Sequence, residues 1–544
     1  MNLSALIHSL VSDTVSSTAA FRPELVLCAT IVFILLLRTI HWTQRIDAFY
    51  VTLVGSAVAL YLAGPWHPID KPSEIFTGLL IYDSFTVYFR TLLLFFVVLF
   101  TIFTRISGVP DRDAAPDVYA LVLGATLGMC IMASSNHLLM VFLGVEMASV
   151  PSYALAGILK GRRQSSEAAL KYAVYGAGTA GVMLYGISLL AGVLGSVHIP
   201  TMAVRLSQLL APENLEHAAL ADTHMVLALG ALMVLVGIAF KLSAVPFHFW
   251  CPDVFEGASA EVNAFLSVAS KAAALALLAR VAIGFSYIPA PLVPVGQTAM
   301  FNVAEQSAGQ SVEFTPAAAE GATSATIPVD RASANEALAP SRKFLADVLA
   351  FLAIITATFG NMAAYGQTNI KRLLAYSTIA QAGYMIMPLP AAMVLAGSDP
   401  EAASGALGAM AFYAGIYLFM NLGAFAVVAF LRNTMHSEQI ADYAGLIRRA
   451  PLVAICFSVM LVSLIGLPPL AGFVGKLLIF YYLVQAKLWT VLVVAGLNTA
   501  ISLYYYLRVV KIMTIDPEPE DRRPAEMPFI PGTYVVLVTM PILV

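Results

Sequence analysis

Residues 237–250 read GIAFKLSAVPFHFW and place a lysine and a proline in one apolar stretch. Pro246 has no backbone N–H to donate to the Leu242 carbonyl, so a helix here is interrupted within about a turn and a half of Lys241. In a membrane, a charged side chain at the centre of a helix costs roughly 2.5–3.5 kcal/mol. The stretch therefore predicts a broken helix that carries a functional lysine.

A second stretch, SLIGLPPLAGFVGK at residues 463–476, has the same arrangement. Its two adjacent prolines leave the Leu464 and Ile465 carbonyls without helical donors, and Lys476 follows about two turns later. The two stretches lie in the fourth members of two groups of five predicted spans, the fourth to eighth and the ninth to thirteenth. Because five is odd, the second group starts from the opposite side of the membrane. Inverted repeats with broken helices are typical of ion transporters. The alternative is that the prolines are accommodated locally, as is common in membrane helices.

The composition around these stretches excludes a soluble globular chain. Of 544 residues, 60% are hydrophobic and 11% are charged, whereas soluble domains carry about 25% charged residues. Long apolar runs that suit the ~30 Å hydrocarbon layer recur along the chain, without the short alternating segments of membrane barrels. We therefore predict an all-α, polytopic transmembrane helical bundle. The fourteen predicted spans cover residues 24–40, 47–64, 82–104, 117–134, 137–158, 168–192, 224–247, 260–285, 344–364, 372–396, 405–431, 451–484, 488–511 and 532–544.

These spans divide the chain into five segments. Residues 287–342 are rich in Ala, Ser, Glu and Thr and poor in aromatic residues, which predicts an outer low-complexity loop with little structure and no chemistry of its own. The last span is shorter than the ~20 residues of a crossing helix, so we expect it to be partial. The predicted segments are N-terminal helices 1–3 (1–116), a first five-helix repeat (117–286), the loop (287–342), a second five-helix repeat (343–511), and a cytoplasmic loop with the final helix (512–544).

The basic residues are distributed unevenly between the loops. Loops that follow odd-numbered spans carry most of the Lys and Arg residues, for example Arg162, Arg163, Arg448 and Arg449. Basic residues concentrate in cytoplasmic loops of membrane proteins. The odd-numbered loops are therefore predicted to face the cytoplasm, and both termini to lie outside.

Glu146 and Lys241 are candidates for a proton switch. Glu146 lies about nine residues into its span, in LLMVFLGVEMASVPSYALAG. Burial favours the neutral form of both side chains, whereas an opposite charge nearby favours both charged forms. A Glu–Lys pair whose separation changes would therefore bind and release a proton. The alternative is a static pair that only holds helices together.

Three further cations are candidates for the same chemistry. Lys271 lies mid-span beside Ser267 and Ser270, small residues that leave room for water, and is predicted to be a relay. Lys476 would serve the proton channel of the other half of the chain. The alternative is that its side chain extends along the helix and places the ammonium group at the membrane interface. Lys171, in SSEAALKYAVYG, lies near the predicted cytoplasmic end, where it is either a proton-access residue or a membrane-edge anchor.

His248, at the cytoplasmic end of the broken seventh span, is a candidate for proton access because histidine titrates near neutrality. The alternative is a hydrogen-bonded structural histidine. The four cysteines form no CxxC motif, so we expect no iron–sulfur cluster or structural zinc in this chain. The GAGTAG at residues 176–181 lies in an apolar helix, not in the strand-to-helix turn that a nucleotide needs, and close helix packing explains it better. We predict no metal or cofactor bound by this chain.

The motifs carry a family resemblance. FLGVEMASVPSYALAG, GIAFKLSAVPFHFWCPDVFEGA, SVASKAA, GNMAAYGQTNIKRLLAYSTIAQAGYM and SLIGLPPLAGFVGK together resemble the antiporter-like subunits of the proton-pumping NADH:quinone oxidoreductase, respiratory complex I. The resemblance covers residues 80 to about 510. It implies that Glu146 is the fifth-helix glutamate, and that Lys241, Lys271 and Lys476 are the lysines of the seventh, eighth and twelfth helices. Lys171 matches a further lysine of the sixth helix.

Among the sister subunits, the N branch is the most similar. The lysine in the twelfth helix favours N over M, which has glutamate there, and the lack of a long lateral helix after residue 511 disfavours L. The departures from the family pattern are the 287–342 insertion and the abrupt end, which puts the fourteenth helix in doubt. Neither departure includes Glu146, Lys241, Lys271 or Lys476.

The resemblance implies a translocase subunit in the bacterial inner (plasma) membrane that moves protons through these residues. NADH, FMN, the iron–sulfur clusters and quinone would be bound by partner subunits, and the partners would be adjacent antiporter-like and small membrane subunits and the lipid bilayer, without nucleic acid. The alternative is a subunit of a Mrp-type monovalent cation/proton antiporter. A third hypothesis is a non-pumping scaffold whose lysines are structural.

Overall fold

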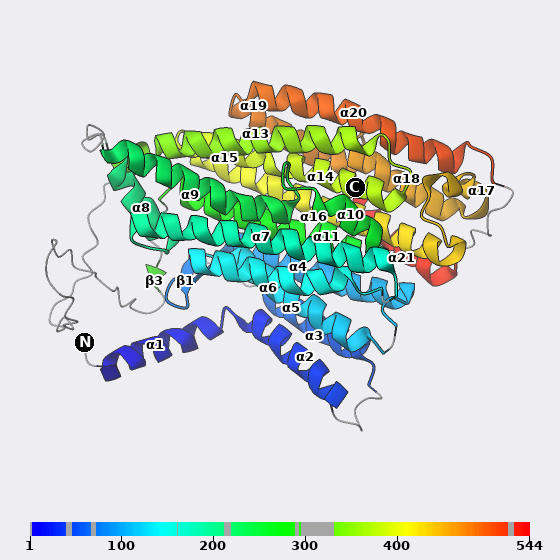
Figure 1. Ribbon diagram of the computed structural model, residues 1–544, viewed down its shortest axis with the longest axis horizontal. Coiled ribbons are helices and arrows are strands. Elements are labelled where there is room, and N and C mark those ends of the chain that lie inside the picture. The colour runs from blue at the N-terminus through cyan, green and yellow to red at the C-terminus, as the bar shows by residue number, and fades with distance from the viewer. Residues whose placement is uncertain are drawn as a thin grey trace.

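A computed structural model describes residues 3–39, 46–66, 72–111, 113–159, 161–211, 219–288, 293–294, 331–519 and 527–543. Long helices run side by side along the long axis of the molecule (Figure 1). They include enough long apolar helices to cross a membrane many times. The predicted all-α, polytopic fold class is confirmed.

The helical elements vary widely in length. In chain order they are α1 (Leu3–Thr18), α2 (Arg22–Thr39), α3 (Ala48–Ala63), α4 (Ser84–Ser107), α5 (Ala115–Ser134), α6 (Leu138–Ala156), α7 (Arg163–Leu194), α8 (Ile199–Leu209), α9 (Ala219–Leu242), α10 (Trp250–Gly257), α11 (Ala260–Gly284), α12 (Arg331–Ala337), α13 (Ala339–Ala364), α14 (Ile370–Ile386), α15 (Pro388–Ala396), α16 (Pro400–Met435), η3 (Ile440–Tyr443), α17 (Leu446–Arg449), α18 (Pro451–Ile465), α19 (Ala471–Gln485), α20 (Trp489–Thr514), α21 (Phe529–Thr539) and η4 (Met540–Ile542).

Local sequence sets several helix ends. Asp83 and Ser259 precede α4 and α11, and their side chains accept hydrogen bonds from backbone N–H groups of the first turn. Gly108 and Gly195 follow α4 and α7 with left-handed backbone angles. That conformation ends a helix at little cost only when the residue is glycine.

Ten helices of the described residues are long and apolar enough to cross a membrane, and the bent pair of α1 and α2 would add one more. Each predicted span coincides with a helix or a pair of helices, but α3, α18, α19 and α21 are shorter than the ~20 residues of a full crossing. Two predicted spans, 372–396 and 451–484, are each divided between two helices. The count of fourteen crossings stays a prediction.

Helix α1 lies outside the predicted spans. It meets α2 at 83°. Its polar side chains face the loop before α4, where Asp13 accepts a hydrogen bond from the Thr77 backbone N–H at 2.7 Å and Ser17 one from the Phe76 N–H at 2.9 Å. Asp13 and Ser17, two of the polar residues that set α1 apart from an apolar span, therefore fix it to this loop.

A small sheet lies at the end of the molecule that is predicted to face outside. Strand β1 (Ser73–Ile75) pairs antiparallel with β2 (Leu80–Tyr82) and parallel with β3 (Val293–Pro294). Strand β3 and helix α12 belong to the predicted loop 287–342, so the described parts of that loop contain a two-residue strand and a short helix. Residues 289–292 and 295–330 lie outside the described residues.

The centre of the bundle is formed by α11, α14 and α16, which are the most enclosed long helices. Figure 1 shows α1 and α2 at one edge of the bundle and α19 and α20 at the opposite edge. Helix α11 packs against α4, α5, α14 and α16. It therefore joins the part of the chain before residue 287 to the part after residue 343.

Glu74, Asn136 and His198 connect the sheet to the helices at this end. The Glu74 carboxylate accepts a hydrogen bond from the Asn136 amide at 3.0 Å and lies 3.1 Å from His198 Nε2. Burial raises the pKa of the Glu74 carboxyl, but the hydrogen bond and positive charge of His198 and the Asn136 hydrogen bond outweigh it and hold that pKa below its ordinary value. The carboxylate is therefore more stable in the folded than in the unfolded chain.

Replacing Glu74 with Gln is expected to lower stability in a pH-dependent way. Because the folded-state pKa lies below the ordinary one, the stabilisation is complete above the ordinary pKa and is lost as the pH falls through the folded-state value. At pH 7 the free energy of unfolding of the variant should be lower than that of the parent by roughly 1 kcal/mol, so the variant should unfold at a lower temperature. This difference should shrink below about pH 4.5. Thermal unfolding between pH 3 and 7 measures this. Glu336→Gln, at an exposed site, is the control, and a constant difference at all pH values would contradict the prediction.

Candidate proton-transfer site

The first helix break lies between α9 and α10, at residues 243–249. Helix α9 ends at Leu242, and Ser243 has a positive φ of 56°. The Val245 backbone N–H donates to Thr356 Oγ1 on α13 at 3.0 Å, so another helix replaces the missing helical partner. The break predicted from Pro246 therefore lies directly after Lys241.

Lys241 is buried at the end of α9, with 1% of its surface exposed. Its Nζ donates a hydrogen bond to Ser149 Oγ on α6 at 3.0 Å. Ser149 Oγ in turn donates to the Val145 carbonyl at 2.6 Å. The ammonium group thus has a neutral hydroxyl as its partner, and no ion pair of Lys241 is found among the described residues.

Glu146 lies on α6, one turn before Ser149, and is half-buried. Its helix neighbours Leu143, Met147 and Val150 are exposed. Within the part of the chain that the structure describes, its carboxylate forms no ion pair with Lys241. The structure therefore brings Lys241 to the helix of Glu146 without an ion pair between the two side chains.

Lys271 lies in the middle of α11, also with 1% of its surface exposed. Its Nζ donates to the Thr378 carbonyl at 2.9 Å and to Thr378 Oγ1 at 3.2 Å. Thr378 is on α14, in the predicted second repeat. Lys271 therefore connects the two predicted repeats at the centre of the bundle.

The second break, residues 466–470, separates α18 from α19. Lys476 on α19 is 2% exposed, and its Nζ donates to the Leu464 carbonyl at 3.1 Å and the Ile465 carbonyl at 2.9 Å. These are the carbonyls that the two prolines leave without helical donors. Nζ also lies 4.1 Å from the centre of the Tyr384 ring. Lys476 therefore binds the backbone of the break itself.

A row of buried polar side chains on α14 leads from Lys271 towards Lys476. Gln381 donates through Nε2 to the Leu464 carbonyl at 2.8 Å and accepts at Oε1 a hydrogen bond from Tyr413 at 2.6 Å. Gln381 Nε2 also lies 3.4 Å from the Tyr506 hydroxyl, which is hydrogen-bonded to Ser377. The residues of this row, the α14 polar row, are Ser377, Thr378, Gln381 and Tyr384.

The α14 polar row was missed by the sequence reasoning. Gln381 follows Ser377 by four residues and Thr378 by three, and Tyr384 follows Gln381 by three, which places these side chains on one side of the helix. The signal was present in AYSTIAQAGYM, residues 375–385, where polar residues interrupt an apolar run at helical spacing. Hydroxyl and amide groups were not counted because they carry no charge.

Two further buried charges were also missed. Glu261 in the first turn of α11 is 2% exposed, and its Oε2 has no hydrogen-bond partner among the described residues. Lys371 at the start of α14 is 2% exposed and donates to the Ala258 carbonyl and to Glu438, each at 2.9 Å. Both lie at helix starts, away from the apolar span centres that single out Glu146 and the three lysines.

Lys171 lies in a different environment from the other three lysines. Its side chain is 38% exposed, and Nζ pairs with Asp253 at 2.8 Å and Glu167 at 2.9 Å. Asp253 also pairs with Arg372 on α14 at 3.1 Å. Lys171, Glu167 and Asp253 border a polar cavity of about 180 Å³. Lys171 is therefore part of a surface ion-pair network that joins α7, α10 and α14.

His248 lies within the first break and is 3% exposed. Its ring packs against Phe249 and Phe359, with ring centres 4.5 and 4.4 Å apart. Nδ1 has no hydrogen-bond partner in the described ranges. Proton access and a structural role both stay predictions for His248. In the same ranges, no group of three or more His, Cys, Asp or Glu side chains is arranged to hold a metal ion.

The chain is similar to known proteins in both sequence and fold. A sequence profile described as "NADH:quinone oxidoreductase/Mrp antiporter, TM" matches residues 135–301 and 332–502. The NADH-quinone oxidoreductase subunit N of Anaeromyxobacter sp. (strain Fw109-5) is 37% identical over 522 residues, 93% of this chain and 89% of that protein.

Two solved structures are also similar. A chain of respiratory complex I from Thermus thermophilus with bound aureothin has a TM-score of 0.69 at 30% identity, covering 96% of both chains. A chain of the Mrp complex from Dietzia sp. DQ12-45-1b has a TM-score of 0.71 at 18% identity, covering 97% of this chain and 94% of that one, and shows the fold alone. The chain belongs to the NADH:quinone oxidoreductase/Mrp antiporter transmembrane family.

Proposed function

We propose that this chain is the proton-translocating subunit N of a membrane NADH:quinone oxidoreductase. The single observation that carries the proposal is that Lys241, Lys271 and Lys476 are all buried and bind only neutral oxygens among the described residues. Structural buried lysines are usually paired with carboxylates, because an uncompensated buried charge is costly. A lysine that is held by carbonyl and hydroxyl oxygens has no carboxylate that keeps it charged, so it is able to bind and release a proton in turn.

The Glu146–Lys241 couple is proposed as the switch. Among the described residues the two side chains form no ion pair, and Lys241 is held by Ser149 one turn from Glu146. The residues after Lys241 form the break, whose backbone lacks continuous helical hydrogen bonds. A shift at the break that brings the ammonium to the carboxylate would favour its charged form, and the return shift would favour release of the proton.

The path from Lys271 to Lys476 is proposed to follow the α14 polar row. Lys271 binds Thr378, and Gln381 binds the same Leu464 carbonyl as Lys476. Hydroxyl and amide groups at this spacing can be bridged by single water molecules. The inverted five-helix repeats predicted from the sequence would place the two broken helices in corresponding positions about this row.

Proton access from the cytoplasm is proposed at the end of the bundle that holds Lys171 and His248. Replacing Lys171 with Ala is expected to lower NADH-driven quinone reduction by less than about twofold, because exposed ion pairs contribute little and Arg372 remains to pair with Asp253. Steady-state quinone reduction by isolated membranes measures this. A loss as large as that expected for Lys241→Ala would instead make Lys171 a required proton carrier.

The redox centres belong to partner subunits in this proposal. NADH, FMN, iron–sulfur clusters and quinone would be bound there, and this chain would contact adjacent antiporter-like and small membrane subunits in the bacterial inner membrane, with both termini outside. The relatives named as NADH-quinone oxidoreductase subunit N support this assignment at 34–37% identity. The Mrp-type antiporter is the second candidate, supported by the Dietzia fold.

Affinity purification of the tagged chain from its own membranes tests the proposal against this second candidate. The expected result is co-purification of iron–sulfur and quinone-binding subunits, with NADH-driven quinone reduction by the purified complex. Co-purification of antiporter subunits alone, with sodium–proton exchange that is independent of NADH, would overturn the proposal in favour of the Mrp type.

A further inference from the structure

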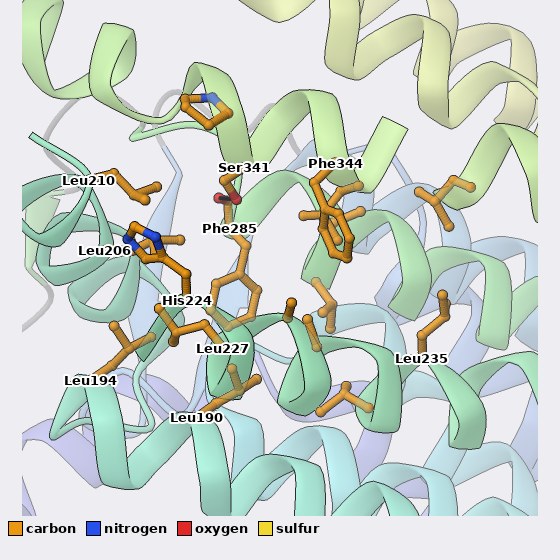
Figure 2. A pocket seen from close by; sticks show the side chains of 18 of the residues that line it. Leu190, Leu194, Leu206, Leu210, His224, Leu227, Leu235, Phe285, Ser341 and Phe344 are labelled. Carbon is orange, nitrogen blue, oxygen red and sulfur yellow. Dashed lines mark hydrogen bonds between the residues drawn. The ribbon is translucent and has the colours of Figure 1, made fainter. Parts of the chain in front are cut away.

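An apolar cavity of about 400 Å³ lies between α7, α8, α9, α11 and α13, and its lining shares no residue with the ion-pair network of Lys171. Figure 2 shows Leu190, Leu194, Leu227, Phe285 and Phe344 around it. The cavity is partly open to the surface of the bundle. Its volume is within the range of about 300–1,000 Å³ that is typical of sites for small ligands.

The polar groups of the cavity lie at one end, which is the end predicted to face outside. His224 lines the cavity, and its Nε2 is buried without a hydrogen-bond partner in the described part of the chain. Ser341 also lines it and donates to the Phe285 carbonyl at 3.3 Å. Arg342 follows, with one guanidinium N–H donated to the Ser286 carbonyl at 3.1 Å, and the next residue, Lys343, is exposed.

We propose that this cavity binds one acyl chain of a membrane phospholipid. The Leu and Phe lining matches a hydrocarbon chain, and the unpartnered His224 Nε2 matches an ester or phosphate oxygen at the glycerol end. The positive charges of Arg342 and Lys343, next to the lining residue Ser341, complement the phosphate of an anionic headgroup at the same end. Because the mouth opens on the face of a membrane bundle, lipid is the apolar molecule that surrounds it.

The position of the cavity gives the lipid a mechanical consequence. Ile238 lines its inner part and lies one turn before Lys241 on α9, and Leu278 lies two turns after Lys271 on α11. Leu345 and Leu349 of α13 form another wall. An acyl chain in the cavity therefore packs between the helices that carry two of the buried lysines and the first helix of the predicted second repeat.

The experiment uses the intact complex in proteoliposomes that contain phosphatidylglycerol with a photoreactive group on one acyl chain. After illumination, peptides that carry the lipid are mapped by mass spectrometry. The expected result is labelling of α9 and α13 peptides that line the cavity. Ala231→Phe, which fills the cavity, should lower this labelling about tenfold, equivalent to about 1.4 kcal/mol. Ala228→Leu is a second, smaller filling variant for the case in which the first does not assemble.

The matched control is Leu229→Phe, on the same helix but 51% exposed and outside the lining. It should leave labelling unchanged. Equal labelling in the parent and in both filling variants, or no labelling of the lining peptides in the parent, would overturn the proposal. Preferential labelling by a photoreactive isoprenoid quinone in place of the phospholipid would overturn it as well, and would assign the cavity to a quinone tail.

Discussion

Lys241→Ala is expected to lower NADH-driven quinone reduction by about tenfold or more in a complex that still assembles. The side chain is almost fully buried, and its partner Ser149 keeps a second hydrogen bond to the Val145 carbonyl when the ammonium is removed. The substitution therefore breaks no ion pair among the described residues. Loss of activity would then report the loss of a proton carrier and not of the fold.

The control for this prediction is Lys487→Ala, which removes an exposed lysine from the loop between α19 and α20. It should reduce quinone at the parental rate. The assembly of both variants is checked by gel filtration of the purified complex. A Lys241→Ala complex with parental activity would favour the scaffold hypothesis, in which the buried lysines only hold helices together.

The second large effect is expected for Lys476. In Lys476→Ala the Ile465 carbonyl loses its lysine donor, whereas the Leu464 carbonyl keeps Gln381. A buried carbonyl without a donor costs roughly 1–3 kcal/mol, so this variant should lose stability as well as proton pumping. Thermal unfolding of the complex and dye-detected acidification of vesicles measure the two losses separately.

Lys476→Arg separates the structural contribution from the chemical one. A guanidinium group retains donors for the carbonyls and stacks on an aromatic ring such as that of Tyr384. It does not release its proton in proteins. The variant should therefore be more stable than Lys476→Ala but should pump as poorly. Parental pumping by Lys476→Arg would show that the residue at this position does not exchange its proton.

The sequence predicted the breaks because their cause is local. A proline removes one backbone N–H donor at a known position in a helix. Both breaks lie beside the prolines and lysines from which they were predicted. The burial of Lys241, Lys271 and Lys476 also followed from their apolar surroundings. Helix ends were less predictable where polar side chains, such as Asp13 and Ser17 of α1, are satisfied by a distant loop.

The partners of Lys241, Lys271 and Gln381 could not be predicted from the sequence. Lys241 and Ser149, Lys271 and Thr378, and Gln381 and Leu464 are separated by 92, 107 and 83 residues. Periodicity indicates which face of a helix is polar but not which helix it meets. For the same reason the sequence indicates a Glu146–Lys241 pair without giving its distance, and it does not indicate that Glu261 and Lys371 are buried.

The central claim is that protons cross the membrane through the buried lysines. Its most direct test is NADH-driven proton uptake by the Lys241→Ala complex in proteoliposomes, recorded with a pH-sensitive dye beside the Lys487→Ala control. The account predicts that uptake falls to about a tenth of the control or less, as expected when a proton-transfer group is removed. Uptake equal to the control in a fully assembled Lys241→Ala complex would contradict it.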